Sequence, residues 1–190
     1  MNLHEALRAA EDLRAADRPA AAVAAVARRL MRPPRLQRAL RGSWLGHPLH
    51  PLMITVPIGA WVCASVLDAR AGNEEAARRL TGIGLAAAPP TVLLGLADYD
   101  RLSRRQQRVG VVHAIANTAA LACFTASYAA RRQGAHVRGK LLSLLGLTAM
   151  GVGGALGGHL AYAQGAGVFR WQRPAEDGTV RPGPSTAVPV

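Results

Sequence analysis

The chain has 190 residues, half of them hydrophobic, and yet carries 23 Lys and Arg against 11 Asp and Glu, a formal net charge of +12. Such a pairing is typical of nucleic-acid-binding proteins or of proteins at a membrane surface, and the distribution of the charges separates the two. Here the basic residues gather between long apolar runs, aromatic residues make up only 4%, and no zinc-finger or RNP-like motif occurs. The sequence therefore favours a membrane protein with no nucleic-acid partner.

Residues 1–43 form a basic N-terminal region that we expect to be helical and amphipathic. Apolar residues recur there at three- and four-residue spacing, at Leu3, Leu7, Val23, Val26 and Leu30. Pro19 and the pair Pro33-Pro34 predict breaks between its helices. The last piece, residues 35–41, is basic and ends before Gly42. It suits either an anionic membrane surface or packing on the protein itself.

Four apolar runs follow, and they predict four transmembrane helices. The runs contain no Lys, Arg, Asp or Glu and cover residues 49–67, 80–97, 109–130 and 141–163. Each is long enough as a helix to cross a hydrocarbon core of about 30 Å. A soluble four-helix bundle would need a polar stripe on every helix, which these runs lack. We expect an all-α fold, an integral membrane four-helix up-down bundle in residues 44–169, followed by a disordered Pro-rich tail in 170–190.

Two of the four runs have features that predict their packing. Pro89-Pro90 lies in the middle of the second run and predicts a kink there. The fourth run is rich in glycine, and its small-xxx-small pairs, Gly153/Gly157 and Gly154/Gly158, allow close approach of a neighbouring helix. We therefore expect the fourth helix to be central in the bundle.

The positions of the basic residues predict the orientation. With an even number of spans, both termini and the middle loop share one side. That side holds nine arginines in residues 1–43, four in 101–108 and three after 169, whereas the loops on the other side hold three and four basic residues. Positive charge is enriched in cytoplasmic segments, so we expect both termini in the cytoplasm. An aromatic belt on this side is expected at Trp44, Tyr99, Tyr162 and Trp171.

Four histidines and one carboxylate converge on this cytoplasmic boundary in an up-down arrangement. His47 and His50 precede and open the first helix, Asp98 ends the second, and His113 with Asn117 one turn later begins the third. His159 lies one turn before the end of the fourth. Ionisable groups in membrane spans are costly and usually face the bundle interior, where they mark a functional site. His4 and His136 fall outside the spans and are expected at the surface.

Three chemistries suit this set of residues, and residue identity does not separate them. Two imidazoles from facing helices suit haem b, His with Asp suits a transition metal such as zinc, iron or copper, and histidine alone suits a proton or quinone site. The structural alternative is that interfacial histidines bind helix ends or headgroups, and that Asp98 pairs with an arginine of the middle loop, such as Arg105 or Arg108.

The motifs themselves resemble a known family. They are GHPLHP at 46–51 with PIG at 57–59, GLAD at 95–98, RVGVVH at 108–113 with Asn117, Ser127 with Arg131-Arg132, and GGALGGHLAY at 153–162. In this order they resemble an uncharacterised bacterial membrane family, domain of unknown function 2231, over about residues 44–169. In that family the membrane module is sometimes fused to a Rieske-type [2Fe–2S] domain, which implies electron transfer. The chain after Phe169 lacks the cysteines and histidines of a Rieske centre, so it resembles the stand-alone module.

The combined interpretation is a multi-pass protein of the bacterial inner membrane that acts as a redox-associated subunit and binds haem b or a metal ion. His113 and His159 are the leading candidate ligands, and His47 and His50 are further ligands or support those ligands. Asp98 and Asn117 are expected to orient the histidines, and in the metal alternative Asp98 is itself a ligand beside the four histidines. Candidate partners are the lipid bilayer, a redox or Rieske-type protein and further copies of the chain. The alternatives are a membrane scaffold without cofactor or a small transporter, and the sequence does not decide whether the protein is an enzyme.

Overall fold

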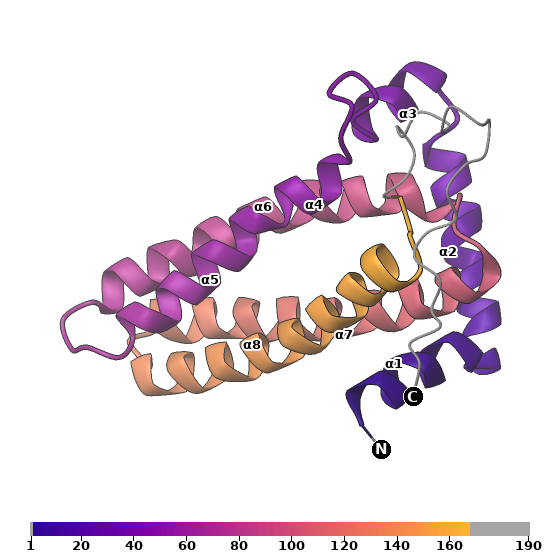
Figure 1. Cartoon of the computed structure of the whole chain (residues 1–190). Coiled ribbons are helices and arrows are strands. Elements are labelled where there is room, and N and C mark those ends of the chain that lie inside the picture. Colours follow the sequence, from indigo (N-terminus) through magenta and orange to yellow (C-terminus); the bar gives the residue numbers. More distant parts are fainter. Residues whose placement is uncertain (1, 168–190) are drawn as a thin grey trace.

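The computed structural model describes residues 2–167, which form helices joined by short loops and contain no strand. Figure 1 shows the long helices side by side, with shorter helices from the N-terminal region gathered at one end. This confirms the predicted all-α four-helix architecture. The predicted Pro-rich tail and Trp171 lie outside the described residues.

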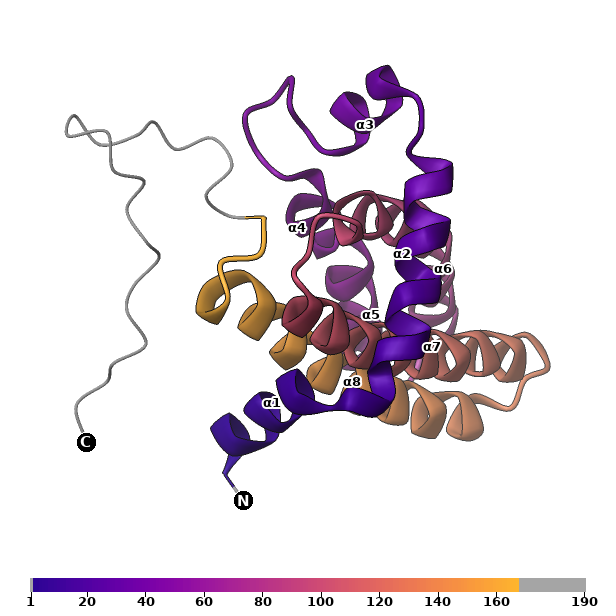
Figure 2. The same cartoon turned by 90° about the vertical axis from the view of Figure 1, so that its right-hand side faces the viewer.

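The N-terminal region folds into short helices that pack on the end of the bundle. They are α1 (Leu3–Asp12), the 3-10 turn η1 (Arg14–Ala16), α2 (Asp17–Leu30) and α3 (Pro34–Leu40). A capping box between Asn2 and Glu5 starts α1. A stripe of small residues on η1 and α2, consisting of Ala16, Ala20, Ala24 and Ala27, packs against Tyr99 and Val111. Figure 2 shows α2 crossing the ends of the long helices.

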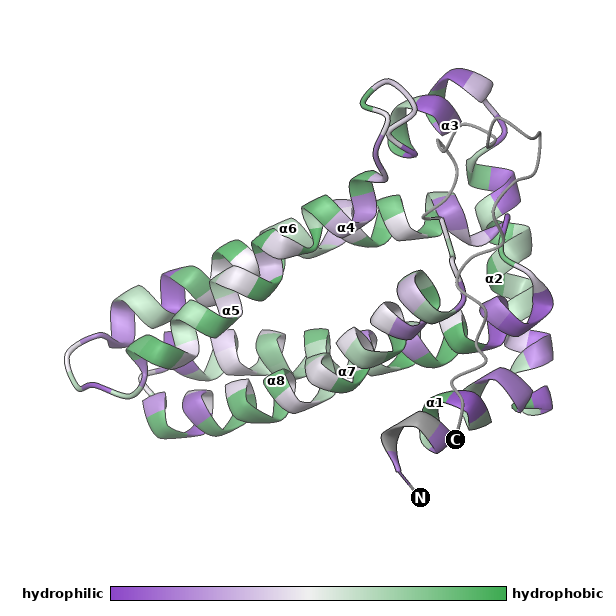
Figure 3. Cartoon of the chain, in the orientation of Figure 1, coloured by the Kyte–Doolittle hydropathy of each residue, from purple (hydrophilic) through white to green (hydrophobic). Residues whose placement is uncertain are grey.

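Four segments of the described chain are long and apolar enough to cross a membrane. They are α4 with α5 (Leu49–Met53 and Thr55–Leu67), α6 (Glu74–Tyr99), α7 (Arg104–Arg132), and α8 (His136–Gly158) continued by the π-helical turn η2 (His159–Ala163). Figure 3 shows hydrophobic residues along these helices and hydrophilic residues concentrated toward their ends. Many large apolar side chains on them are exposed, among them Val66, Val92, Ile115 and Leu145. Such a surface suits lipid as the surrounding solvent.

The helices form two antiparallel hairpins, α5 with α6 and α7 with α8, which Figure 1 shows as two layers. Between α7 and α8, glycines of one helix accept large or polar side chains of the other. The pairs are Gly139 with Arg131, Gly146 with Phe124, Gly153 with Asn117 and Gly157 with His113. The spacing between successive glycines on α8 equals the spacing between their partners on α7, in the opposite direction. The antiparallel pair therefore keeps one register along its whole length. These glycines therefore allow the two backbones to approach closely.

The hairpins meet at Trp61 and Phe124, whose rings stack with centroids 4.1 Å apart. Trp61 occupies a notch at Gly84 of α6, because a Cβ atom there would lie 2.3 Å from the indole nitrogen. That nitrogen donates a hydrogen bond to the carbonyl oxygen of Thr81. The α6 helix is continuous through Pro89-Pro90.

Two expectations from the sequence need correction. The more central of the last two spans is α7 and not α8, since α7 contacts α6, α8, α1 and α2, whereas α8 contacts α7 and α5 and its glycines serve mainly its contact with α7. Tyr99 is not part of an aromatic belt: it is buried under α2, and its hydroxyl donates to the carbonyl oxygen of Gln107. Trp44 and Tyr162 are exposed, as the belt requires.

Candidate functional site

His50 lies in the first turn of α4, where prolines start the helix. Pro48 is the N-cap residue, and Pro51 lies within the first turn. The Nδ1 atom of His50 is 2.9 Å from the carbonyl oxygen of Thr91 on α6. A Cβ atom at Gly95 would lie 2.9 Å from the His50 ring, so the imidazole occupies a notch that glycine leaves open.

His113 makes matching contacts between α7 and α8. Its Nδ1 atom is 2.8 Å from the carbonyl oxygen of Gly153, and its ring lies beside Gly157, where a Cβ atom would be 3.0 Å away. The amide nitrogen of Asn117 donates to the His113 carbonyl over 2.8 Å and is 3.3 Å from both ring nitrogens. A donor equidistant from two ring nitrogens lies off the lone-pair direction of each, so the Asn117 amide contacts the His113 ring but makes a poorly directed hydrogen bond to it.

The carbonyl contacts define the protonation of both rings. A carbonyl oxygen can only accept a hydrogen bond, so Nδ1 of His50 and Nδ1 of His113 must carry the proton. In a neutral imidazole the other nitrogen, Nε2, is then a lone-pair donor able to bind a metal or accept a proton. The two rings come from different hairpins, His50 from α4, which packs on α6, and His113 from α7. The structure thus orients two of the predicted ligands in the same way, each through a carbonyl oxygen of a neighbouring helix.

His159, by contrast, is bound to the N-terminal region. It is buried at the end of α8, and its Nε2 atom is 2.6 Å from Oε1 of Glu11 on α1. Burial alone would raise the pKa of Glu11, but hydrogen bonds from His159 and Gln164, with the nearby charges of His159 and Arg105, outweigh it and lower that pKa. His159 therefore fastens α1 to the bundle.

The remaining two candidates also have local partners. His47 is exposed in the loop before α4, and its Nδ1 atom lies 2.9 Å from the carbonyl oxygen of Pro48. Oδ1 of Asp98 lies 3.9 Å from Nε of Arg41, a residue of the N-terminal region that the sequence did not suggest as its partner. Arg108, one of the expected partners of Asp98, binds Asp17 on α2 over 2.6 Å and lowers the pKa of that carboxyl group.

A metal site built from all five predicted residues is not assembled in the part of the chain that the structure describes. Within residues 2–167 no group of three or more His, Cys, Asp or Glu side chains is placed to hold a metal ion. The arrangement instead consists of a pair of oriented imidazoles, His50 and His113, and a separate His159–Glu11 contact.

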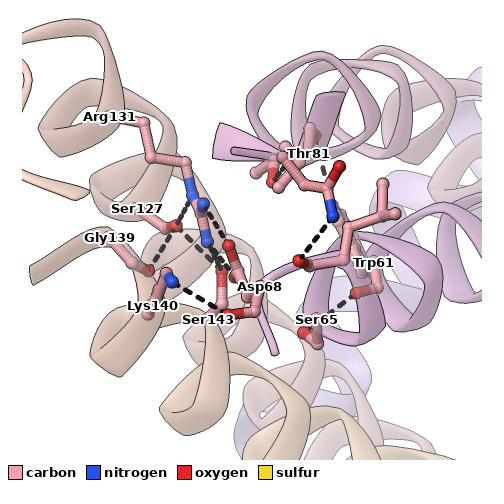
Figure 4. A network of polar contacts seen from close by, with 12 residues as sticks. Trp61, Ser65, Asp68, Thr81, Ser127, Arg131, Gly139, Lys140 and Ser143 are labelled. Carbon is pink, nitrogen blue, oxygen red and sulfur yellow. Dashed lines mark hydrogen bonds and ion pairs between the residues drawn. The ribbon is translucent and has the colours of Figure 1, made fainter. Parts of the chain in front are cut away.

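A buried ion pair at the opposite end of the bundle was missed by sequence reasoning. The Arg131 side chain is 0% exposed and that of Asp68 9%. Their two hydrogen bonds are 2.8 and 2.5 Å long. Figure 4 shows this guanidinium group between the end of α5 and the α7–α8 hairpin. The sequence signal was the motif of Ser127 with Arg131, since one helical turn separates the two residues.

The hydroxyl groups around Arg131 complete the network. Ser127 accepts a hydrogen bond from Nε of Arg131 over 3.1 Å and donates to the carbonyl oxygen of Gly139, while Ser143 accepts from Nη2 over 3.2 Å. Lys140 donates from Nζ to the backbone carbonyl of Asp68 over 2.8 Å. Figure 4 shows all these groups turned toward one another. The charge is therefore paired and hydrogen-bonded, as burial of an ionised group requires.

Comparison with known proteins identifies the family. The family described as "Predicted membrane protein (DUF2231)" matches residues 46–170. The chain belongs to this family. No curated protein and no solved structure matches it. The resemblance seen in the sequence motifs is thereby confirmed, together with the membrane character of the chain.

The DUF2231 region contains both His50 and His113 with all their contacts, and also Asp68 and Arg131. The partners of His159 and Arg108, namely Glu11 and Asp17, lie before residue 46. The oriented imidazole pair is therefore contained within the family's own region, whereas the fastening of α1 and α2 depends on the N-terminal extension.

Proposed function

We propose that this DUF2231 chain is a redox-associated membrane subunit that binds haem b between its two hairpins, where His50 and His113 would hold the iron. The observation that carries the proposal is the fixed orientation of both rings: each Nδ1–H donates to a backbone carbonyl of a neighbouring helix, at Thr91 and Gly153. Ligating histidines usually make this type of contact, which fixes the tautomer and raises the basicity of Nε2.

The set of donors fits haem better than a bare metal ion. A structural or catalytic zinc site needs three or four protein ligands, whereas haem iron already has four porphyrin nitrogens and needs one or two from the protein. A bound haem would supply one-electron transfer. The protein's own contribution is to orient the two imidazoles through Thr91 and Gly153 and to hold the His113 ring with Asn117.

The topology that accompanies this proposal follows from charge. We place both termini in the cytoplasm of a bacterial cell and the chain in the inner membrane, because the end that carries the N-terminal helices and the α6–α7 loop holds most of the arginines. An electron partner such as a Rieske-type protein is proposed on the strength of the fusions that the sequence resemblance implies.

An absorption spectrum of detergent-purified protein, together with iron analysis, tests the proposal. We expect a Soret band that is lost in His50→Ala and in His113→Ala and is retained in His159→Ala and in His136→Ala. His113→Gln is a sharper variant, because its amide can still donate to the Gly153 carbonyl but is a poor ligand of iron. Colourless wild-type protein that stays colourless after reconstitution with haem would refute the proposal.

A second function, a scaffold without cofactor, is favoured by one observation. Both rings fill glycine notches, at Gly95 and Gly157, and their hydrogen bonds tie helices together, as helix-end contacts would. In that case the protein is colourless, and His50→Ala and His113→Ala lower its free energy of unfolding with no other effect. The spectrum of the wild-type protein separates the two functions.

A further inference from the structure

A segment with no role in the imidazole site carries a strong and one-sided charge. We name residues 28–45 the basic arm; it comprises the end of α2, the helix α3 and the following loop. Its exposed arginines are Arg28, Arg29, Arg32, Arg35 and Arg38. No Asp or Glu occurs between Asp17 and Asp68, and none of these five arginines forms an ion pair with another described residue. Within the described part of the chain, their charge therefore has no acidic counterpart.

The basic arm also exposes large apolar side chains among its arginines. Leu36 is 40% exposed, Leu45 is 45% exposed and Trp44 is 71% exposed. The indole nitrogen of Trp44 donates to the carbonyl oxygen of Ala39, which holds the ring against the end of α3. Arginines interleaved with tryptophan and leucine are typical of helices that lie in the headgroup layer of a membrane.

One buried arginine anchors the arm to the bundle. Arg41 is 3% exposed and donates to the carbonyl oxygen of Ala97 and to Asp100, each over 2.6 Å, and to Gln37 over 3.0 Å. Ala97 and Asp100 lie at the end of α6, and the first span begins at Leu49, a few residues after the arm. The arm is thereby held at the level where the spans end.

The position of α3 relative to the spans decides the partner. Figures 1 and 2 show α3 to the side of the bundle, beside the last turns of α6, whereas α2 crosses the ends of the long helices. A segment placed beside the ends of membrane spans lies over lipid, not over protein. None of the residues of α3 is buried.

We infer that the basic arm is a docking surface for anionic phospholipid headgroups, with Trp44, Leu36 and Leu45 in the interfacial layer. Each basic residue near an anionic surface contributes about five-fold to the binding constant, so three arginines correspond to a factor on the order of 100. This inference is independent of haem binding.

A nitroxide on the arm tests the inference in intact protein. The label is placed on Ala39→Cys, an exposed site of α3, in a background in which Cys63 and Cys123 are replaced by Ser. Its accessibility to oxygen and to a water-soluble nickel chelate is measured in nanodiscs of phosphatidylcholine alone and of phosphatidylcholine with phosphatidylglycerol in equal parts. We expect the anionic lipid to protect the label from the nickel chelate and high salt to reduce that protection.

A triple variant and its matched control complete the test. Replacing Arg32, Arg35 and Arg38 by Gln should shift the ratio of docked to undocked label toward the undocked state by a factor on the order of 100. The control replaces three exposed basic residues from the other end of the bundle, Arg70, Arg132 and Arg138, by Gln and should leave the label unchanged. Equal accessibility in the two lipid compositions, or equal shifts in the two triple variants, would overturn the inference.

Discussion

Replacing Asp68 by Leu should destabilise the protein strongly, because it leaves the Arg131 guanidinium buried without its counter-charge. Arg131 makes two hydrogen bonds to Asp68 and one each to Ser127 and Ser143. The two lost bonds are charge-assisted, and each such bond contributes about 1.5–3 kcal/mol. The resulting loss of about 3–6 kcal/mol agrees with the roughly 3–5 kcal/mol typical when one partner of a buried pair is removed.

The double variant Asp68→Leu/Arg131→Met shows whether the destabilisation comes from the unpaired buried charge or from a general loss of packing. A buried ion pair replaced by apolar residues of similar size is often nearly neutral, so the double variant should be more stable than the single one by at least about 2 kcal/mol. The two serines can remain paired, since their hydroxyl oxygens are 2.9 Å apart and Ser127 donates to Gly139. The free energy of unfolding is measured in mixed detergent micelles, with circular dichroism as the signal for unfolding.

An exposed pair serves as the control. Arg79 and Glu75 are 2.7 Å apart on the outer face of α6, with both side chains largely solvent-exposed. Arg79→Gln should therefore change the free energy of unfolding little, because solvent screens such pairs. If Asp68→Leu costs no more than Arg79→Gln, or if the double variant is as unstable as the single one, the reasoning about the buried charge is wrong.

Two further predictions concern α8 and α1. Gly153→Ala should cost about 1–3 kcal/mol, because its Cβ atom would lie 2.6 Å from Asn117, whereas the adjacent Gly154→Ala meets nothing within 4 Å. Gly154→Ala should be neutral or stabilising by up to about 1 kcal/mol, and equal effects of the two changes on unfolding would contradict the register. Because the folded pKa of Glu11 is lowered from 4.5, its stabilising contact with His159 is fully present above pH 4.5 and is lost as the pH falls through the folded pKa. Acid should therefore lower the melting temperature less in Glu11→Gln than in the wild type, and equal acid sensitivity would count against this contact.

The membrane spans could be predicted from the sequence because hydropathy alone determines which segments tolerate lipid. The first predicted run, residues 49–67, coincides with the span observed at Leu49–Leu67. The other helices extend beyond their apolar runs, as α7 does from Arg104 to Arg132. Charged residues at the ends of a span keep helical hydrogen bonds while their side chains reach water, so charge does not mark the end of a helix.

The candidate site could be predicted only in part, because a sequence places residues along a helix axis more readily than around it. Gly153 and Gly157 face α7, and His159 follows two residues later, about 200° further around an α-helix. It therefore points away from His113 and meets Glu11 of α1. No periodicity in the sequence links two residues so far apart.

A signal for the register was nevertheless present. Gly146 and Gly153 of the fourth run, and Gly139 just before it, are spaced by seven residues. A heptad of small residues predicts one continuous face toward a single neighbouring helix. If that face is assigned to the third helix, Arg131 lies opposite Gly139. Arg131 is therefore buried between the helices, whereas its charge had suggested a position in a loop.

Glycines set the register of the helices within each hairpin, but the two hairpins contact each other at few places. The distant ion pair is one of these places, so it can affect the position of the two imidazoles. Trp61 stacks on Phe124 in the middle, the Asp68–Arg131 pair joins the hairpins at one end, and α2 covers the other. His50 and His113 belong to different hairpins, so their relative position depends on these joints and not on either hairpin alone. If the two histidines share a haem, Asp68→Leu should weaken haem retention in the folded fraction although Asp68 belongs to a separate network. If folded Asp68→Leu retains as much haem as the wild type, the two hairpins keep their relative position without this ion pair.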